Sequence, residues 1–124
     1  MKIELPWPDS ALLPNNSSGH HWATKQSAKQ QAISDATWAT KKALFDDIGP
    51  RIDPEFDAEL SIYFYPPDNR GRDVDGMLSS MKPALDAIAK TIGINDRRFR
   101  PVHLYPLDKI DGGRVIVVLD QIPF

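Results

Sequence analysis

The sequence predicts an α/β domain of the α+β type, built in two layers, with two helices packed on a mixed β-sheet in the order β-α-β-α-β-β. Three observations predict this class. Several stretches alternate apolar and polar residues, as half-buried strands do, and two longer stretches carry apolar residues at helical spacing. Turn-forming residues separate these stretches. The 124 residues suffice for one domain and are too few for two, so we expect a single domain over residues 1–124.

The first predicted strand covers residues 2–6, where apolar and polar residues alternate up to a proline. Residues 7–23 are rich in Pro, Asn, Ser and Gly and predict a long loop. Residues 24–48 are mostly good helix formers with a modest apolar face, and Gly49 and Pro50 stop this helix.

The second half of the chain predicts a strand over residues 58–65, a helix over 75–92, and strands over 101–108 and 114–120. An Asp-Gly-Gly sequence between the last two strands is typical of a β-hairpin. Pro83 lies inside the second helix, where an interior proline costs about 3 kcal/mol. Either the helix is continuous and kinked, or 76–81 is a separate turn and Pro83 begins the main helix. We favour the continuous, kinked helix.

The charge is segregated along the chain, although the net charge is only −2. Residues 70–100 hold seven basic and four acidic residues, whereas the remainder holds eight basic and thirteen acidic ones. One region could therefore meet a polyanion. The chain has no cysteine and no stretch near the roughly 20 apolar residues that span a membrane. The N-terminal residues carry no signal-peptide pattern, so we expect a cytoplasmic protein.

The motif Arg72-Asp73-Val74-Asp75 is the strongest chemical signal. Two carboxylates one residue apart share a face in extended chain but diverge by about 200° on a helix. We therefore expect Asp73 and Asp75 on extended chain just before the second helix. Two carboxylates can hold a hard cation such as Mg²⁺, which also takes waters and phosphate oxygens.

A polar stripe continues from this motif along the second helix. Asp75, Ser79, Lys82 and Asp86 fall within roughly 60° of one another at helical spacing. Asp96 follows a Gly-Ile-Asn turn and can supply a further ligand. The arginines expected to contact phosphate are Arg70, Arg72, Arg97, Arg98 and Arg100.

These residues suggest metal-assisted phosphodiester hydrolysis, in which Lys82 neutralises developing charge. Other interpretations stay open. Asp75 could simply cap the helix, Asp86 could be a solvated residue or pair with Lys82, and the arginines could belong to a polar turn. The adjacent His20 and His21 are expected to be polar loop residues, and Trp7 and Trp38 to be packing residues.

Several motifs together resemble the RusA family of Holliday junction resolvases. The resemblance extends from residue 3 to about residue 120, with its segments in consistent order. Each segment alone is weak evidence for the family, and the ordered set is specific. The matching segments are Leu5-Pro6-Trp7-Pro8, Pro14-Asn15, His21-Trp22, Arg72-Asp73-Val74-Asp75, Lys82-Pro83-Ala84-Leu85-Asp86-Ala87-Ile88 and Gly93-Ile94-Asn95-Asp96.

The resemblance implies a homodimeric, Mg²⁺-dependent endonuclease that cuts four-way DNA junctions in recombination and repair, with Mn²⁺ as an alternative ion. It assigns Asp73, Asp75 and Asp96 as metal ligands and Lys82 as the catalytic lysine. Asp86 and Ser79 are candidates for supporting positions beside them. Family and size suggest a bacterial or phage-infected host cell.

The chain departs from the family pattern at two positions. Gly76 stands where the family usually has Asn, and Ser79 stands where its lysine often lies, so Lys82 is displaced by three residues on the same helix face. Two other functions stay open: a non-catalytic protein that binds branched DNA, and a small interaction protein whose Asp cluster is structural.

Overall fold

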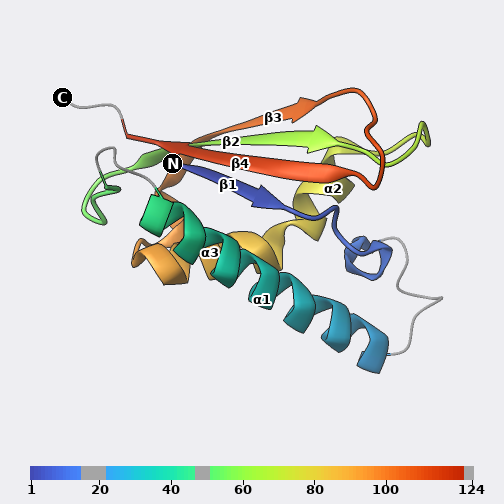
Figure 1. The fold of residues 1–124 in the computed structure, drawn as a ribbon, viewed down its shortest axis with the longest axis horizontal. Coiled ribbons are helices and arrows are strands. Elements are labelled where there is room, and N and C mark those ends of the chain that lie inside the picture. The colour runs from blue at the N-terminus through green and yellow to red at the C-terminus, as the bar shows by residue number, and fades with distance from the viewer. Residues whose placement is uncertain (15–21, 47–50, 122–124) are drawn as a thin grey trace.

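The computed structural model describes residues 1–14, 22–46 and 51–121 (Figure 1). It contains three α-helices and a four-stranded mixed sheet, which confirms the predicted α+β class. The predicted helix stop at Gly49 and Pro50 and the histidines His20 and His21 lie outside the described residues. The elements in chain order are β1 (Lys2–Leu5), the 3₁₀ turn η1 (Ser10–Leu12), α1 (Trp22–Asp46), β2 (Ala58–Tyr65), α2 (Val74–Ser80), α3 (Lys82–Ile92), the 3₁₀ turn η3 (Asp96–Arg98), β3 (Phe99–Pro106) and β4 (Arg114–Asp120).

The strands lie in the order β1-β4-β2-β3. Strand β4 pairs antiparallel with β1 and β2, whereas β2 and β3 run parallel across the α2–α3 crossover. The predicted hairpin between the last two strands is therefore wrong, because β2 lies between them. The Leu107 N–H donates to Phe64 O (2.8 Å) and the Ile110 N–H donates to Pro66 O (2.9 Å). These bonds carry the chain across the end of β2, so the Asp-Gly-Gly turn delivers β4 to the far side of that strand.

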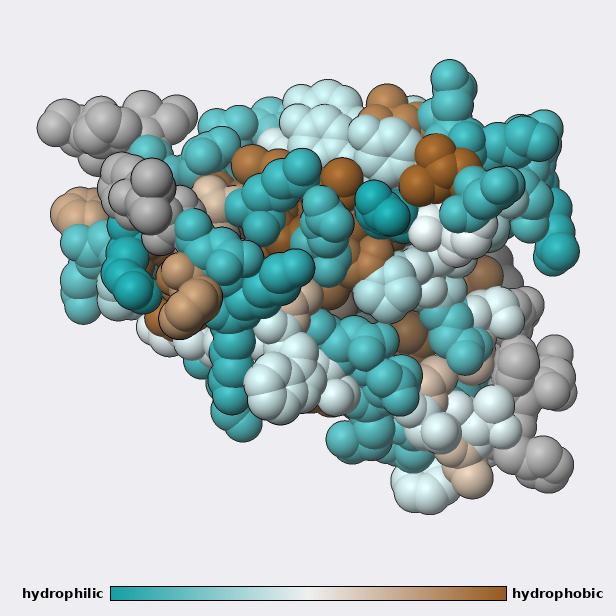
Figure 2. All heavy atoms as spheres, viewed as in Figure 1, coloured by the Kyte–Doolittle hydropathy of each residue, from teal (hydrophilic) through white to brown (hydrophobic). Residues whose placement is uncertain are grey.

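Alternation along the strands places the core on one face of the sheet. In β2, Leu60, Ile62 and Phe64 are buried, and the residues between them are half-buried. Helices α1 and α3 cover this face, and no described helix covers the other (Figure 1). Hydrophilic residues cover most of the side seen in Figure 2, and apolar atoms show mainly between sheet and helices. None of the described helices combines the length and apolar composition needed to cross a membrane.

The second helix is broken, and the prediction of one continuous, kinked helix is wrong. Its first piece, α2, closes with the Met81 N–H donating to Leu78 O (3.1 Å), and α3 opens with the Leu85 N–H donating to Met81 O (2.9 Å). Pro83 explains the break, because proline has no N–H to donate and its ring crowds the carbonyl four residues earlier. Pro83 instead lies in the first turn of α3, where proline is favoured.

Gly113 is required by both its backbone conformation and its surroundings. Its φ of 68° lies in the left-handed region, and a Cβ there would lie 2.9 Å from the Trp7 Cβ. Trp7 in turn packs edge-on against Phe64, with ring centroids 6.1 Å apart. The prediction that Trp7 is a packing residue is confirmed. Trp38 is different, since it is 69% exposed beneath the Lys41 ammonium, and the prediction that it packs is wrong.

We predict that Gly113→Ala destabilises the fold by more than Gly112→Ala. Both positions have positive φ, so an alanine at either costs about 1–2 kcal/mol of backbone strain. Only Gly113 adds a steric clash, because nothing lies within 4 Å of a Cβ at Gly112. Denaturant unfolding of the two variants measures the difference. Equal losses of stability would contradict the packing of Trp7 against this turn.

Candidate functional site

Asp73 occupies the N-cap position of α2 without capping it. Its backbone is extended, with φ −78° and ψ 136°, and its carbonyl accepts the Met77 N–H (3.0 Å). An aspartate at this position ordinarily accepts a hydrogen bond from an N–H of the first turn through its side chain. The Asp73 side chain accepts no such bond. The exposed carboxylate is therefore left for another partner.

Asp75 lies in the first turn of α2, so the prediction that both acids lie on extended chain is wrong. The helix begins at Val74, one residue earlier than predicted, and takes Asp75 with it. The alternative that Asp75 caps the helix is also wrong, since the N-cap is Asp73. Both aspartates nevertheless line one open depression of about 430 Å³, which we call the acid depression. It is completed by Pro14, Val74, Gly76 and Ser79.

Ser79 also lines a neighbouring depression of about 480 Å³, which we call the lysine depression. Lys82 and Asp86 enter it from α3, and Lys25 and Lys29 enter it from α1. The predicted polar stripe thus continues across the helix break through Ser79. Lys25 and Lys29 were not foreseen as site residues. Their spacing of four residues places them on one helix face, but nothing in that spacing indicates which element the face meets.

The Asp96 carboxyl lies beside Asp86 rather than in the acid depression. Partial burial raises the pKa of the Asp86 carboxyl, and the hydrogen bond and like charge of Asp96 raise it further. Lys82 and Lys29 act in the opposite direction on this pKa. The structure therefore presents two pairs of acids, Asp73 with Asp75 and Asp86 with Asp96, on either side of Ser79 and Lys82.

Within residues 1–14, 22–46 and 51–121, no three Asp, Glu or His side chains lie close enough together to hold a metal ion. The structure thus does not assemble Asp73, Asp75 and Asp96 into one group. Mg²⁺ commonly binds through one or two carboxylates and completes its shell with waters and phosphate oxygens. The exposed, uncapped carboxylate of Asp73, together with Asp75, fits that requirement.

Four of the five arginines expected to contact phosphate already pair with acids. Arg72 Nη2 lies 2.7 Å from Asp68 Oδ1, and Arg70 Nε lies 3.4 Å from the other oxygen of that carboxyl. A backbone hydrogen bond from Arg70 and a side-chain bond from Arg72 lower the pKa of Asp68. The Arg72 side chain is only 19% exposed, and its guanidinium lies over the Trp7 ring. Arg72 thus anchors the loop before Asp73.

The second arginine group meets Asp57 at the start of β2. Arg100 Nε lies 2.7 Å and Arg98 Nη1 lies 3.5 Å from its carboxylate oxygens. Among the described residues, Arg97 forms no side-chain ion pair, and its backbone N–H donates to Asn95 Oδ1 (3.0 Å). Exposed pairs of this kind contribute only about 0–1 kcal/mol, so a phosphate could displace the acid from Arg100 or Arg70.

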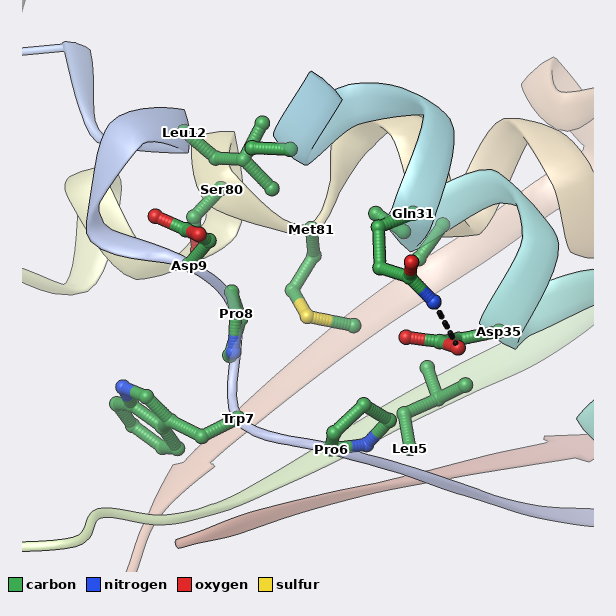
Figure 3. A pocket seen from close by; sticks show the side chains of 13 residues that line it. Leu5, Pro6, Trp7, Pro8, Asp9, Leu12, Gln31, Asp35, Ser80 and Met81 are labelled. Carbon is green, nitrogen blue, oxygen red and sulfur yellow. Dashed lines mark hydrogen bonds between the residues drawn. The ribbon is translucent and has the colours of Figure 1, made fainter. Parts of the chain in front are cut away.

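A third hollow, of about 260 Å³, lies between the N-terminal segment, α1 and α3 (Figure 3). Its walls are mainly apolar, and the Met81 side chain points into it from the α2–α3 break. Gln31 and Asp35 form its polar side, with Gln31 Nε2 donating to Asp35 Oδ1 (2.9 Å). Leu12 lines both this hollow and the lysine depression, so the two hollows are neighbours.

We predict that Asp86→Asn stabilises the protein at pH 7 in EDTA. The pKa of Asp86 is raised in the folded state, so folding favours its protonated form. The stability that the protonated Asp86 contributes is fully present below the unfolded pKa, near 3.8, and is lost as the pH rises through the folded pKa. At pH 7 the wild type therefore carries an unfavourable charge that Asn does not have. The thermal midpoint of the variant should exceed that of the wild type at pH 7, and the difference should shrink towards pH 3. Equal midpoints at pH 7 would contradict a raised pKa of Asp86 in the folded protein.

The sequence is similar to that of a bacterial protein. No protein-family model matches the sequence. The chain is 33% identical over 120 residues to a protein of Xylella fastidiosa described as an uncharacterized protein. The match covers 97% of this chain and 76% of that protein. At this identity and coverage, the chain belongs to the same family as the Xylella fastidiosa protein.

Proposed function

We propose that this protein is a Mg²⁺-dependent, structure-specific endodeoxyribonuclease that resolves four-way DNA junctions by hydrolysing phosphodiester bonds. One observation carries the proposal. The acid depression, which contains the uncapped carboxylate of Asp73, adjoins the lysine depression through Ser79. Carboxylates repel phosphate unless a cation lies between them, and ammonium groups attract it. An acidic site for a cation beside a basic site for phosphate fits metal-assisted cleavage of a polyanion.

Asp73 and Asp75 are the proposed ligands of the ion, and Asp96 lies apart from them, beside Asp86. The ion, when bound, would polarise the phosphoryl oxygen and lower the pKa of an attacking water. Lys82 is exposed at the start of α3 and would place its ammonium against charge that develops on the phosphate. The Ser79 hydroxyl lies between the two depressions, where it can donate a hydrogen bond to a bound phosphate.

The direct test is cleavage of a synthetic four-way junction against a linear duplex built from the same arm sequences. We expect nicks in the junction with Mg²⁺ or Mn²⁺ and none with EDTA. Asp75→Asn should lower the rate about 100-fold or more, since it removes a proposed metal ligand. Asp108→Asn, an exposed acid in the loop before β4, is the matched control and should cleave like the wild type.

If neither Mg²⁺ nor Mn²⁺ supports nicking, the nuclease proposal is refuted. Junction binding that survives EDTA, without cleavage in Mg²⁺ or Mn²⁺, would instead identify a non-catalytic branched-DNA-binding protein. Full activity of Asp75→Asn in saturating Mg²⁺ would refute the assignment of the site while leaving the activity in place.

The proposal includes a homodimer, because two nicks at symmetric positions of a junction need two sites related by a two-fold axis. The sheet face without helices offers a surface for such pairing (Figure 1). On it, Tyr63 and Tyr105 stack with ring centroids 4.8 Å apart, and Tyr105 remains 40% exposed.

We predict that light scattering of the purified protein gives twice the chain mass of 13.9 kDa. Tyr105→Glu should shift the protein towards monomer, because the substitution would bury a charge in the paired face. A monomeric wild type at the concentrations that support cleavage would contradict the dimer.

A further inference from the structure

We propose that Lys25 and Lys29 of α1, together with Lys82, form the main cradle for the DNA backbone, in place of the arginines that follow the acidic motifs. The proposal rests on the nuclease function and adds the path of the substrate: the strand runs from the acid depression across Ser79 to the first turns of α1. The ligand is a run of backbone phosphates, and the contact carries no base sequence.

The three lysines converge from elements distant in the sequence. Lys25 and Lys29 are one helical turn apart on α1, and Lys82 begins α3, the helix that packs against α1. All three line the same hollow, whose acidic residue is Asp86. Three ammonium groups and one carboxylate leave the lysine depression positively charged. Gln26 and Ser79 add hydrogen-bonding groups to its wall.

Unlike four of the five arginines, these lysines are not already held in ion pairs with acids among the described residues. No ion pair engages Lys25, Lys29 or Lys82 within the part of the chain that the structure describes. Arg100 and Arg72 each lie 2.7 Å from a carboxylate oxygen, and that acid must be displaced before either can bind a phosphate. A lysine without an ion-pair partner binds a phosphate mainly at the cost of hydration and counterions, and Asp86 acts on Lys29 and Lys82 only through its nearby charge. The lysine depression is therefore the more favourable contact.

Apart from Asp86, which lines the lysine depression, and Asp96, which contacts Asp86, the main cluster of acidic residues lies too far away to cancel this charge. This cluster begins at Asp46 at the end of α1 and continues in the segment that follows. Asp46 lies 21 positions after Lys25 on α1, which is about 30 Å at the rise of an α-helix. The Debye length is about 8 Å at physiological ionic strength, so this repulsion is screened at the lysine depression. A net charge of −2 is thus compatible with a local DNA-binding surface.

The test compares two double variants of α1 in binding to a fluorescent four-way junction in EDTA, over a range of salt concentrations. Lys25→Gln/Lys29→Gln removes the cradle, and Lys41→Gln/Lys42→Gln makes the same charge change near the other end of the helix. We expect the first variant to lose about tenfold or more in affinity at about 0.1 M salt and to lower the salt slope by about two. The second variant should keep both quantities near those of the wild type. Lys25→Arg/Lys29→Arg should restore the slope.

The outcomes separate this proposal from the nuclease proposal. If the wild type cleaves junctions and the two glutamine variants bind equally, the cradle is wrong and the nuclease stands. If the slope depends on Lys25 and Lys29 but neither Mg²⁺ nor Mn²⁺ supports cleavage, the nuclease is wrong and the phosphate cradle stands. Thermal midpoints of all variants establish that each is folded, and the arginine variant shows that charge rather than packing is measured.

Discussion

The break between α2 and α3 is the constraint on which the site depends. Pro83 has no N–H to donate, and in a continuous helix its ring would clash with the carbonyl four residues earlier, so the chain forms a short helix and a longer one. The short helix α2 begins with the two exposed aspartates, and α3 packs against α1. Ser79, just before the break, borders both depressions.

Acidic and basic side chains lie side by side at this break without forming ion pairs with each other among the described residues. Asp73 stands at a helix start without capping it, and Lys25, Lys29 and Lys82 line a hollow without ion-pair partners among the described residues. Arg72 and Arg100, by contrast, are each held by a nearby acid, Asp68 and Asp57. A divalent cation and a phosphate backbone together would satisfy both sets.

The sequence was sufficient to predict the elements but not all of their neighbours. Alternation in β2 predicted its buried residues, because one face of the sheet packs on helices and the other does not. The Asp-Gly-Gly turn predicted a reversal of direction, yet it could not specify that β2 lies between β3 and β4. Pro83 was recognised as a problem, but its position alone left both a kink and a break open. The acidic motif was found, although helix α2 begins one residue earlier and places Asp75 on the helix.

Some contacts of the site residues can be predicted from the sequence, and others arise only from the tertiary structure. Asp68 is four residues from Arg72, so that pair was open to recognition, whereas Asp57 is 43 residues from Arg100 and meets it only through the pairing of β2 with β3. Lys25 and Lys29 are brought to the site only by the packing of α1 on α3, which the sequence does not indicate. Local patterns thus indicated the acids, and tertiary contacts decided which basic residues accompany them.

The central claim is that Asp73 and Asp75 hold the divalent ion. Calorimetric titration of the protein alone with Mn²⁺ tests it most directly, because it needs neither DNA nor turnover. We expect Asp73→Asn/Asp75→Asn to weaken Mn²⁺ binding about tenfold or more, and more than Asp86→Asn/Asp96→Asn does. The reverse order would place the ion at the other pair of acids, and an unchanged affinity in both variants would contradict a metal site at this break.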